Sequence, residues 1–548
     1  MTVVRQRLRS APTYLATVMI AIGGWMHRWM NEDAYINLRI VDQIFAGNGP
    51  VFNAGERIEA ATSPLWLAVL VVGRAMFGLF VRDEWIAVIA SLIFAVTAFT
   101  IAGRAAGLLH RDDDGVVVPI GLILVAAVAV VWDFSTSGLE MGLVFLWLAS
   151  SWYVLVSVAR AEAINGRKRL GFGVVLGLAP LVRPELAVMM LCFLVAWFTL
   201  VRPRRLRFDL VAIFALPVAY QLFRMGYYGT LVPNTALAKD AGHLYVHQGW
   251  NYAKDFIGAY HLWLTAAFVA LVVLLRYRRQ RDRRIAVATT AMLAAAVLNG
   301  AYIVAIGGDY MHGRLLLPAF FAFGLPASVA IRRQDVAEAG VGALAGAWAL
   351  TSVIAFRPPP PPPGYVVAPI ADWRAVSGGK VVLDDVSFGL NGHDAAALYA
   401  SGVRGYFRVA TTDPVPGDDP SGFVLTLGSI GVPAYDAGRR VWVIDIGGLA
   451  EPLAARTTAI PGRPAGHRKQ IDPAWYDARF TPPSPNDSPE VRAARHVLTC
   501  APIAQLLDAV DSDLTAGQFL SNLWHSVEYT RIEVPADPIE AEQRYCPP

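Results

Sequence analysis

The chain has 548 residues, 55% of them hydrophobic, and its mean hydropathy of +0.44 is too high for a soluble protein of ordinary composition. Several stretches of roughly 17 to 22 apolar residues match the thickness of a bilayer core. The net charge of +4 is small, and the arginines stand beside apolar stretches instead of forming one aromatic-interleaved face. We therefore expect a membrane protein that does not bind nucleic acid.

The apolar stretches predict about eleven transmembrane helices whose loops follow the positive-inside rule. The first stretch resembles a signal sequence, but no small-residue cleavage site follows it, so we interpret it as a retained anchor. The stretch 63–80 contains Arg74 and has a proline near its start, and we interpret it as a helix lying in or dipping into the outer interface. With it excluded, every basic cluster falls on the cytoplasmic side, the N-terminus is cytoplasmic and the C-terminus is outside. The predicted spans are 11–27, 85–103, 116–132, 139–159, 170–183, 185–201, 208–225, 260–276, 285–306, 313–331 and 336–356.

Nearly all the unusual polar motifs fall on the exterior side of this arrangement. The exterior segments are 28–62, 133–138, 183–185, 226–259 and 307–313, whereas the cytoplasmic loops hold little beyond arginine. A transport pathway would need polar groups on both sides. The asymmetry therefore favours a working site that faces the exterior.

A run of six prolines, Pro358 to Pro363, divides the chain into two parts. Such a run favours an extended polyproline II spacer. We expect a membrane domain over 1–357, with an exterior loop over 28–84 that carries interfacial helices, then a linker over 358–364. Residues 365–548 are long enough for one exterior soluble domain. Buried strands are predicted at 381–383 and 441–444 and helix over 489–512, which indicates a mixed α/β domain. Cys500 and Cys546 both lie in this domain, where an oxidising exterior favours a disulfide over two free thiols.

An acidic pair, Glu32 and Asp33, directly follows the first apolar segment. Two carboxylates at a membrane edge are energetically costly to keep near lipid, so their presence there needs a structural or functional explanation. One interpretation is a solvated pair that marks the interface. The long polar and glycine-rich stretch that follows favours a functional loop instead. The pair is our first candidate for catalytic residues.

Four further exterior motifs carry charged, amide or aromatic side chains. Glu140 opens a predicted span, where it either caps the helix or takes part in catalysis. Arg183, in a tight turn, either grips a phosphate bidentately or pairs with Glu185 or Glu140. A third motif contains Tyr228, Asn234 and Lys239. The aromatic ring and the amide are suited to binding a sugar and the lysine to binding a phosphate, although the tyrosine also fits an aromatic belt at the membrane interface. Asp309, His312 and Arg314 stand within one eight-residue segment at a membrane edge.

Metal and nucleotide motifs are absent from the sequence, including HExxH, CxxC, EF-hand, Walker and Rossmann patterns. We therefore expect no metal and no cofactor. The energy for a reaction must then come from an activated substrate. A polyprenyl phosphate is the natural candidate, because its lipid stays in the bilayer while its head reaches the outer surface.

With these motifs, the chain resembles the GT-C class of polytopic glycosyltransferases, and within it the actinobacterial terminal β-(1→2) arabinofuranosyltransferases. The matching stretches are 46–53 with 55–57, 136–140, 181–185, 223–240, 307–314, 519–522 and 525–526, together with both C-terminal cysteines. The family pattern has two aspartates where this chain has Glu32 and Asp33. This departure makes Asp33 the stronger candidate for the essential carboxylate and leaves the role of Glu32 open.

The resemblance implies a polytopic α-helical membrane protein of the GT-C type in the plasma membrane, with a C-terminal extracytoplasmic domain that helps to hold polysaccharide. The implied donor is decaprenyl-phosphoryl-arabinofuranose, and the implied acceptor is the non-reducing ends of arabinogalactan and lipoarabinomannan. Asp33 and Glu32 are then the catalytic candidates. The candidates for binding donor phosphate or sugar are Arg183, Lys239, His312, Arg314, Asn234, Tyr228, Asp309 and Glu140. The alternatives are another polyprenyl-phosphate-sugar transferase such as a mannosyltransferase, a lipid-linked sugar flippase, and a non-catalytic envelope scaffold.

Overall fold

The computed structural model describes residues 11–201, 206–279, 281–332, 335–357, 380–381, 405–407, 423–427, 430–463 and 466–546. The chain divides into two compact units, each discontinuous in sequence. Unit 1 comprises 1–30, 80–218 and 244–381, and unit 2 comprises 31–79, 219–243 and 382–548. Two segments of the expected membrane domain, 31–79 and 219–243, therefore belong to the unit that holds the C-terminal residues. The proline run of the expected linker lies outside the described residues.

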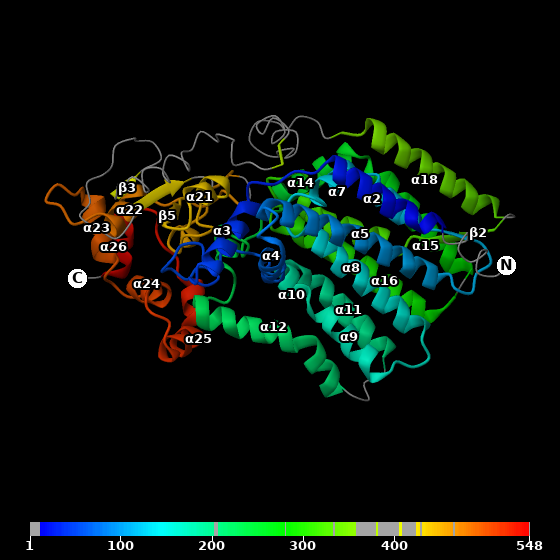
Figure 1. The fold of residues 1–548 in the computed structure, drawn as a ribbon, viewed down its shortest axis with the longest axis horizontal. Helices are drawn as coiled ribbons and strands as arrows, with labels where there is room; N and C mark the ends of the chain where they lie inside the picture. The colour runs from blue at the N-terminus through cyan, green and yellow to red at the C-terminus, as the bar shows by residue number, and fades with distance from the viewer. Residues whose placement is uncertain are drawn as a thin grey trace. The chain divides into compact units, whose positions relative to one another are not determined.

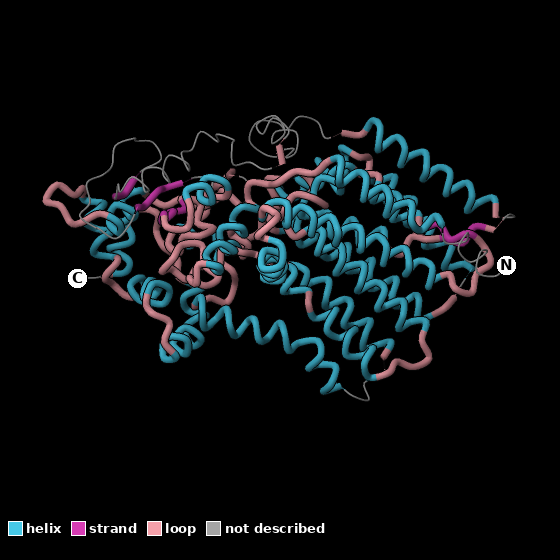
Figure 2. The backbone as a smooth tube through the Cα atoms, in the orientation of Figure 1, coloured by secondary structure: helices cyan, strands magenta, loops and turns pink. Residues whose placement is uncertain are grey.

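Unit 1 is almost entirely helical (Figures 1 and 2). Long helices pack side by side, with α5 against α8 and α11 against α16. The most apolar window of α8 is 78% buried, so this helix lies inside the bundle. The elements of unit 1 are η1 (Ala11–Tyr14), α2 (Leu15–Met26), α5 (Asp83–Leu109), β1 (Val116–Val118), α6 (Ile120–Ala126), α7 (Ala129–Phe134), α8 (Met141–Arg160), α9 (Gly166–Gly177), α10 (Ala179–Val182), η2 (Pro184–Leu186), α11 (Ala187–Leu200), most of α12 (Leu206–Tyr228), α14 (Val246–Ala259), α15 (Leu262–Arg279), α16 (Arg283–Ala305), η3 (Arg314–Leu316), α17 (Leu317–Gly324), β2 (Val329–Ile331) and α18 (Val336–Ala355).

Five of the described helices are long and apolar enough to cross a membrane, namely α5, α8, α12, α16 and α18. The number rises to six if α14 and α15, which are bent by 79° at their junction, count as one span. These helices coincide with predicted spans, and further apolar helices of 10–17 residues accompany them. The protein is therefore mostly helical and embedded in a membrane.

Two predicted spans contain a short strand in the structure, and a third, 170–183, is divided into α9 and α10. The stretch 116–132 begins as strand β1 and continues as the short helices α6 and α7, because Val128 between them is extended. The stretch 313–331 ends as a helix at Gly324, two residues before Pro326, because proline has no N–H with which to continue the helical hydrogen bonds. The chain then forms β2, which pairs antiparallel with β1.

Unit 2 combines short helices with a parallel sheet of order β3-β4-β5. β5 coincides with the strand predicted at 441–444, whereas 382 and 383 of the other predicted strand lie outside the described residues. The predicted helix over 489–512 is two helices, α23 and α24. The elements of unit 2 are α3 (Ala34–Phe45), α4 (Pro64–Phe77), the end of α12, α13 (Asn234–Ala238), β3 (Gly405–Phe407), β4 (Phe423–Leu427), α21 (Val432–Ala437), β5 (Val441–Asp445), η4 (Ala454–Arg456), α22 (Pro473–Phe480), α23 (Pro489–Val497), α24 (Ile503–Asp511), α25 (Ala516–Arg531) and α26 (Pro538–Tyr545).

The core of unit 2 is built around Trp475, which is fully buried. Residues of β5 and of the helices α22 to α26 surround it, including Ile444, Leu506 and Tyr529. A disulfide joins Cys500 to Cys546 and closes a loop of 46 residues over this core. The alternative of two free thiols is therefore wrong.

Candidate functional site

The two carboxylates of the acidic pair have different surroundings in unit 2. Glu32 is only 7% exposed, and its Oε1 accepts a hydrogen bond from the Gly431 N–H at 2.5 Å. A Cβ at position 431 would lie 2.0 Å from the Glu32 carbonyl oxygen, so only glycine fits there. Glu32 is therefore not a solvated interface residue, and its side chain holds two distant segments of the chain together.

Asp33 is the more accessible carboxylate, and it stands at the start of α3. Its N–H donates to the Asn31 Oδ1 at 2.8 Å, and Asn31 is fully buried. The Asp33 side chain does not cap α3. The turn thus fixes the backbone of Asp33 while the carboxylate is not used for helix capping.

A buried guanidinium locks α3 in place. Arg39 is 1% exposed and donates to the carbonyl oxygens of Phe52 at 2.9 Å and of Val441 at 2.7 Å, and also to that of Ala434. A buried cation that bonds several backbone oxygens fixes the spacing of the elements that carry them. Arg39 therefore holds α3, and the acidic pair at its start, against β5 and α21.

The glycine-rich loop after α3 carries a second buried carboxylate, Glu56, which is 2% exposed. It pairs with Arg479 at 2.9 Å, and the same guanidinium contacts Glu451 at 3.3 Å and Asp511 at 2.9 Å. Burial raises the pKa of Glu56 to about 8, against the opposing effect of Arg479. One cation facing three carboxylates gives a physical reason for one carboxyl to hold its proton.

Three of the candidate binding residues, Tyr228, Asn234 and Lys239, lie on the 219–243 segment of unit 2. The Tyr228 ring is buried, and its hydroxyl donates to the Pro50 carbonyl at 2.8 Å. The Asn234 amide donates to the carbonyl of Gly448 at 2.8 Å and accepts from Arg456 at 3.3 Å. Lys239 is partly buried at the end of α13. Tyr228 and Asn234 therefore hold the loop, and Lys239 is the most accessible of the three.

In unit 1, Arg183 lies between two carboxylates. Its Nη1 contacts Glu140 and its Nε contacts Glu185, so it pairs with both of the partners considered from the sequence. Glu140 is the N-cap residue of α8, but its side chain accepts no capping hydrogen bond. The capping role considered for Glu140 is therefore wrong, and its carboxylate orients the guanidinium.

Arg314 and Asp309 form the neighbouring pair in unit 1. The Arg314 Nε donates to Asp309 Oδ2 at 2.5 Å, and both side chains are 5% exposed. Arg314 is also near enough to Arg183 and Glu140 for their charges to interact. The structure thus brings together four residues from three separate sequence motifs.

His312 adds an imidazole whose two nitrogens differ. Its Nδ1 lies 2.5 Å from Asp255 Oδ2, and the ring packs near Phe256 and Tyr260. Its Nε2 is buried and has no hydrogen-bond partner among the described residues. A carboxylate on one imidazole nitrogen orients the ring and sets its tautomer, which leaves the other nitrogen for a substrate or a proton.

Sequence reasoning did not identify Asp255, Arg39 or Arg479. Asp255 lies in the predicted exterior segment 226–259, and this position could have marked it as a candidate. Its partner, His312, is 57 residues away in sequence, so no local motif connects the two. Arg39 and Arg479 gave no signal, because their partners come from remote segments. Among the described residues, the group of His, Cys, Asp and Glu side chains with metal-like spacing is His496, Cys500 and Cys546, and its cysteines are joined by the disulfide.

The chain is similar over nearly its whole length to two proteins of the same name. It is 30% identical to the terminal β-(1→2)-arabinofuranosyltransferase of Corynebacterium glutamicum, over 98% of this chain and 88% of the relative. It is 32% identical to the protein of the same name from Mycobacterium tuberculosis, over 94% of each chain. Residues 412–544 match the profile described as the AftB family C-terminal domain. No solved structure matches the chain.

Proposed function

Because the chain belongs to the family of terminal β-(1→2)-arabinofuranosyltransferases, we propose that it adds the terminal β-(1→2)-linked arabinofuranose to non-reducing ends of cell-wall arabinan. The observation that carries this proposal is similarity over nearly the full length of two relatives of that name. The chain is a glycosyltransferase, and the matched C-terminal residues tie the proposal to the same family.

The proposed donor is decaprenyl-phosphoryl-arabinofuranose, and the proposed acceptors are arabinogalactan and lipoarabinomannan. A lipid-linked donor fits a protein embedded in a membrane, since its chain stays in the bilayer while its head is presented at the surface. The positive-inside pattern supports a plasma-membrane orientation with the N-terminus in the cytoplasm and the C-terminal domain outside. In that orientation the segments that carry the candidate residues face the exterior.

Asp33 is the proposed catalytic carboxylate. Glycosyl transfer from a phosphate passes through an oxocarbenium-like state, which a nearby carboxylate stabilises. Asp33 suits this role better than Glu32, because the Glu32 carboxylate is buried and bonded to the Gly431 N–H. A β-linked donor that yields a β-linkage requires retention of configuration.

The basic residues of unit 1 are the proposed ligands of the donor phosphate. Arg183 and Arg314 provide guanidiniums held in place by Glu140, Glu185 and Asp309. Guanidinium groups match the geometry of phosphate oxygens and stay charged at any working pH. Lys239 of unit 2 is a further proposed phosphate ligand, whereas Asn234 and Tyr228 position the loop that carries it.

His312 contributes the Nε2 that has no partner among the described residues. Oriented by Asp255, this nitrogen either donates a hydrogen bond to the leaving phosphate or accepts the proton of the attacking hydroxyl. Both roles place it at a reacting group. The leaving phosphate is already stable, so the base needs little adjustment of its proton affinity.

The test is transfer from a short-chain polyprenyl-phosphoryl-arabinofuranose to a synthetic arabinan fragment by the full chain in nanodiscs. Asp33→Asn is expected to lower turnover by about a thousandfold with unchanged thermal unfolding. Asp42→Asn is the matched control, because Asp42 stands on the same helix and pairs with Arg74 at 3.0 Å. Normal turnover by Asp33→Asn contradicts the assignment of the carboxylate. Transfer from a mannosyl donor, and none from the arabinosyl donor, contradicts the proposed donor.

A further inference from the structure

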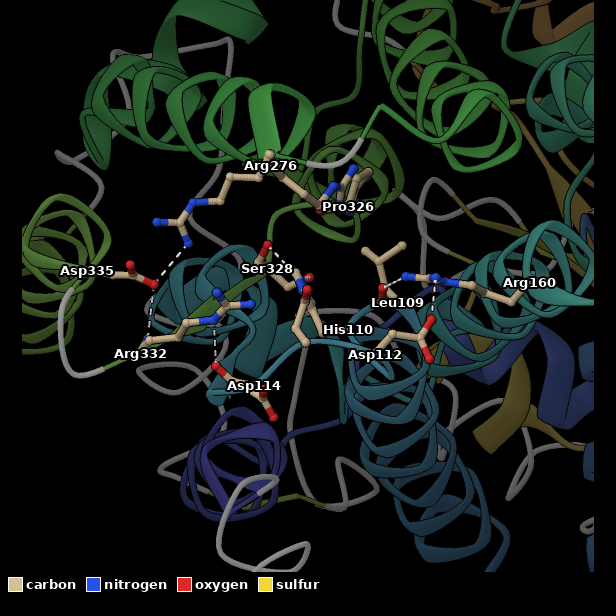
Figure 3. Close-up of polar contacts among 12 residues, drawn as sticks. Leu109, His110, Asp112, Asp114, Arg160, Arg276, Pro326, Ser328, Arg332 and Asp335 are labelled. Atoms are coloured by element: carbon tan, nitrogen blue, oxygen red, sulfur yellow. Dashed lines mark hydrogen bonds and ion pairs between the residues drawn. The ribbon is translucent and has the colours of Figure 1, made fainter.

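A polar cavity of unit 1 is lined by none of the residues proposed for glycosyl transfer. Its volume is about 310 Å³, within the range of small-ligand pockets. It lies where the last residues of α5, the end of α15, strand β2 and the first turn of α18 meet (Figure 3). The charged and polar lining residues are His110, Asp113, Arg276, Arg279, Arg332 and Glu338.

The arginines of this cavity are not equally neutralised. Arg279 is paired with Asp335 at 2.9 Å and with Glu338 at 2.8 Å. Asp113 is paired with His110 at 2.7 Å. Both lining carboxylates therefore already have partners within the wall. The Arg332 backbone N–H donates to Asp335 Oδ2 at 3.2 Å (Figure 3), but among the described residues neither the Arg276 nor the Arg332 guanidinium forms an ion pair with a carboxylate.

Arg276 is the most unusual of these side chains, because it is 8% exposed and contacts no carboxylate among the described residues. Its Nη1 donates to the Pro326 carbonyl at 2.6 Å and its Nη2 to the Thr289 hydroxyl at 2.8 Å. A guanidinium has five N–H groups, so three have no described partner. A buried charge without a counter-ion is strongly unfavourable, which makes an anion in this cavity favourable.

Arg332, an exposed residue directly after β2, offers a second guanidinium. Its Nε donates to the Asp114 carbonyl at 2.8 Å, and its two terminal nitrogens have no partner among the described residues. Together the two arginines present several N–H donors in one cavity, which suits the oxygens of a phosphate group.

Exposed apolar side chains stand on the same helices. Leu274 is 45% and Tyr277 55% exposed on α15, and Val336 is 82% exposed at the start of α18. α18 is apolar enough to cross a membrane by itself, and α15 is so together with α14. Basic pockets between transmembrane helices are typical binding sites for lipid head groups. We propose that this cavity binds the phosphate of an anionic phospholipid, whose acyl chains lie along α15 and α18.

The full chain in detergent tests this assignment by native mass spectrometry during titration with phosphatidylglycerol, with phosphatidylcholine as the zwitterionic comparison. We expect retention of one phosphatidylglycerol at a concentration about tenfold lower than for phosphatidylcholine. Arg332→Gln is expected to weaken phosphatidylglycerol binding about tenfold, through loss of charge-assisted hydrogen bonds. Arg276→Gln should weaken it at least as much. If Arg276→Gln does not fold, the Arg332→Gln variant alone decides the test.

Arg278→Gln is the matched control, because Arg278 is an exposed arginine of the same basic cluster that does not line the cavity. It should bind phosphatidylglycerol as the unchanged protein does. An equal loss in Arg278→Gln, or no loss in Arg332→Gln, overturns the proposal in favour of non-specific attraction. Competition by inorganic phosphate at the same concentration as the lipid overturns it in favour of a site for a free anion.

Discussion

Glu59 and Arg224, which are 165 residues apart in sequence, form a bidentate ion pair inside unit 2. The Arg224 Nε lies 2.5 Å from Glu59 Oε2, and its Nη2 lies 3.1 Å from Oε1. The Tyr220 hydroxyl donates to the same carboxylate at 2.7 Å, and Glu59 is 3% exposed. The pair ties the loop before α4 to the end of α12.

Removing one partner of this pair should destabilise the protein strongly. Glu59→Gln leaves the Arg224 charge buried without its carboxylate, so we expect a loss of about 3 to 5 kcal/mol in the free energy of unfolding. Thermal unfolding of the full chain in detergent measures the effect. Glu59→Gln combined with Arg224→Met should recover part of the loss. A double variant no more stable than Glu59→Gln would show that the pair is not the cause.

Glu56 should make stability depend on pH. Burial raises its pKa from 4.5 to about 8, so between these values the folded chain holds a proton that the unfolded chain has lost. The folded state therefore binds more protons, and the free energy of unfolding falls as pH rises from about 4.5 to about 8. The contribution of one group is at most about 1.4 kcal/mol per pH unit.

Glu56→Gln should flatten this dependence, because the amide does not titrate. Unfolding temperatures of both proteins across about pH 4 to 9, chosen to bracket the interval between the two pKa values, test the prediction. Parallel curves for the two proteins would mean that Glu56 does not titrate in this range.

The disulfide Cys500–Cys546 should contribute measurably to the stability of unit 2. It closes a loop of 46 residues, and loop-closure entropy gives about 2 to 4 kcal/mol for such a cross-link. Cys500→Ser with Cys546→Ser should therefore lower the unfolding temperature, and reduction of the unchanged protein should do the same. Cys192, the free cysteine among the described residues, supplies the control. Cys192→Ser should change little, and an equal loss there would argue against the disulfide as the source.

Asp255 should act on transfer through His312. With the 2.5 Å contact removed, Asp255→Asn is expected to lower the transfer rate by about a hundredfold, and His312→Gln to a similar extent. The double variant should lose little more than either single one, because the two residues act as one unit. Lys254→Gln, at the exposed neighbouring position, is the control. Losses that multiply in the double variant would show that Asp255 and His312 act separately.

The membrane class and most long helices were predictable from sequence, because each depends on a contiguous stretch of the chain. Apolar windows coincide with α5, α8, α12, α16 and α18. The two cysteines of the C-terminal part pointed to one disulfide. The errors came where an apolar stretch is interrupted, by the extended Val128 and at Pro326, since hydropathy does not report where single residues end a helix.

The sequence by itself determined which charged, amide and aromatic residues lie at the predicted membrane edges. These motifs were enough to recognise the family. The tertiary structure decided what each side chain does. Glu32 bonds to a residue 399 positions away, and Glu59 to one 165 positions away. Hydropathy and charge are properties of local windows, whereas a buried carboxylate takes its partner from whichever element packs against it. Partners so far apart in sequence are therefore set only when the chain has folded.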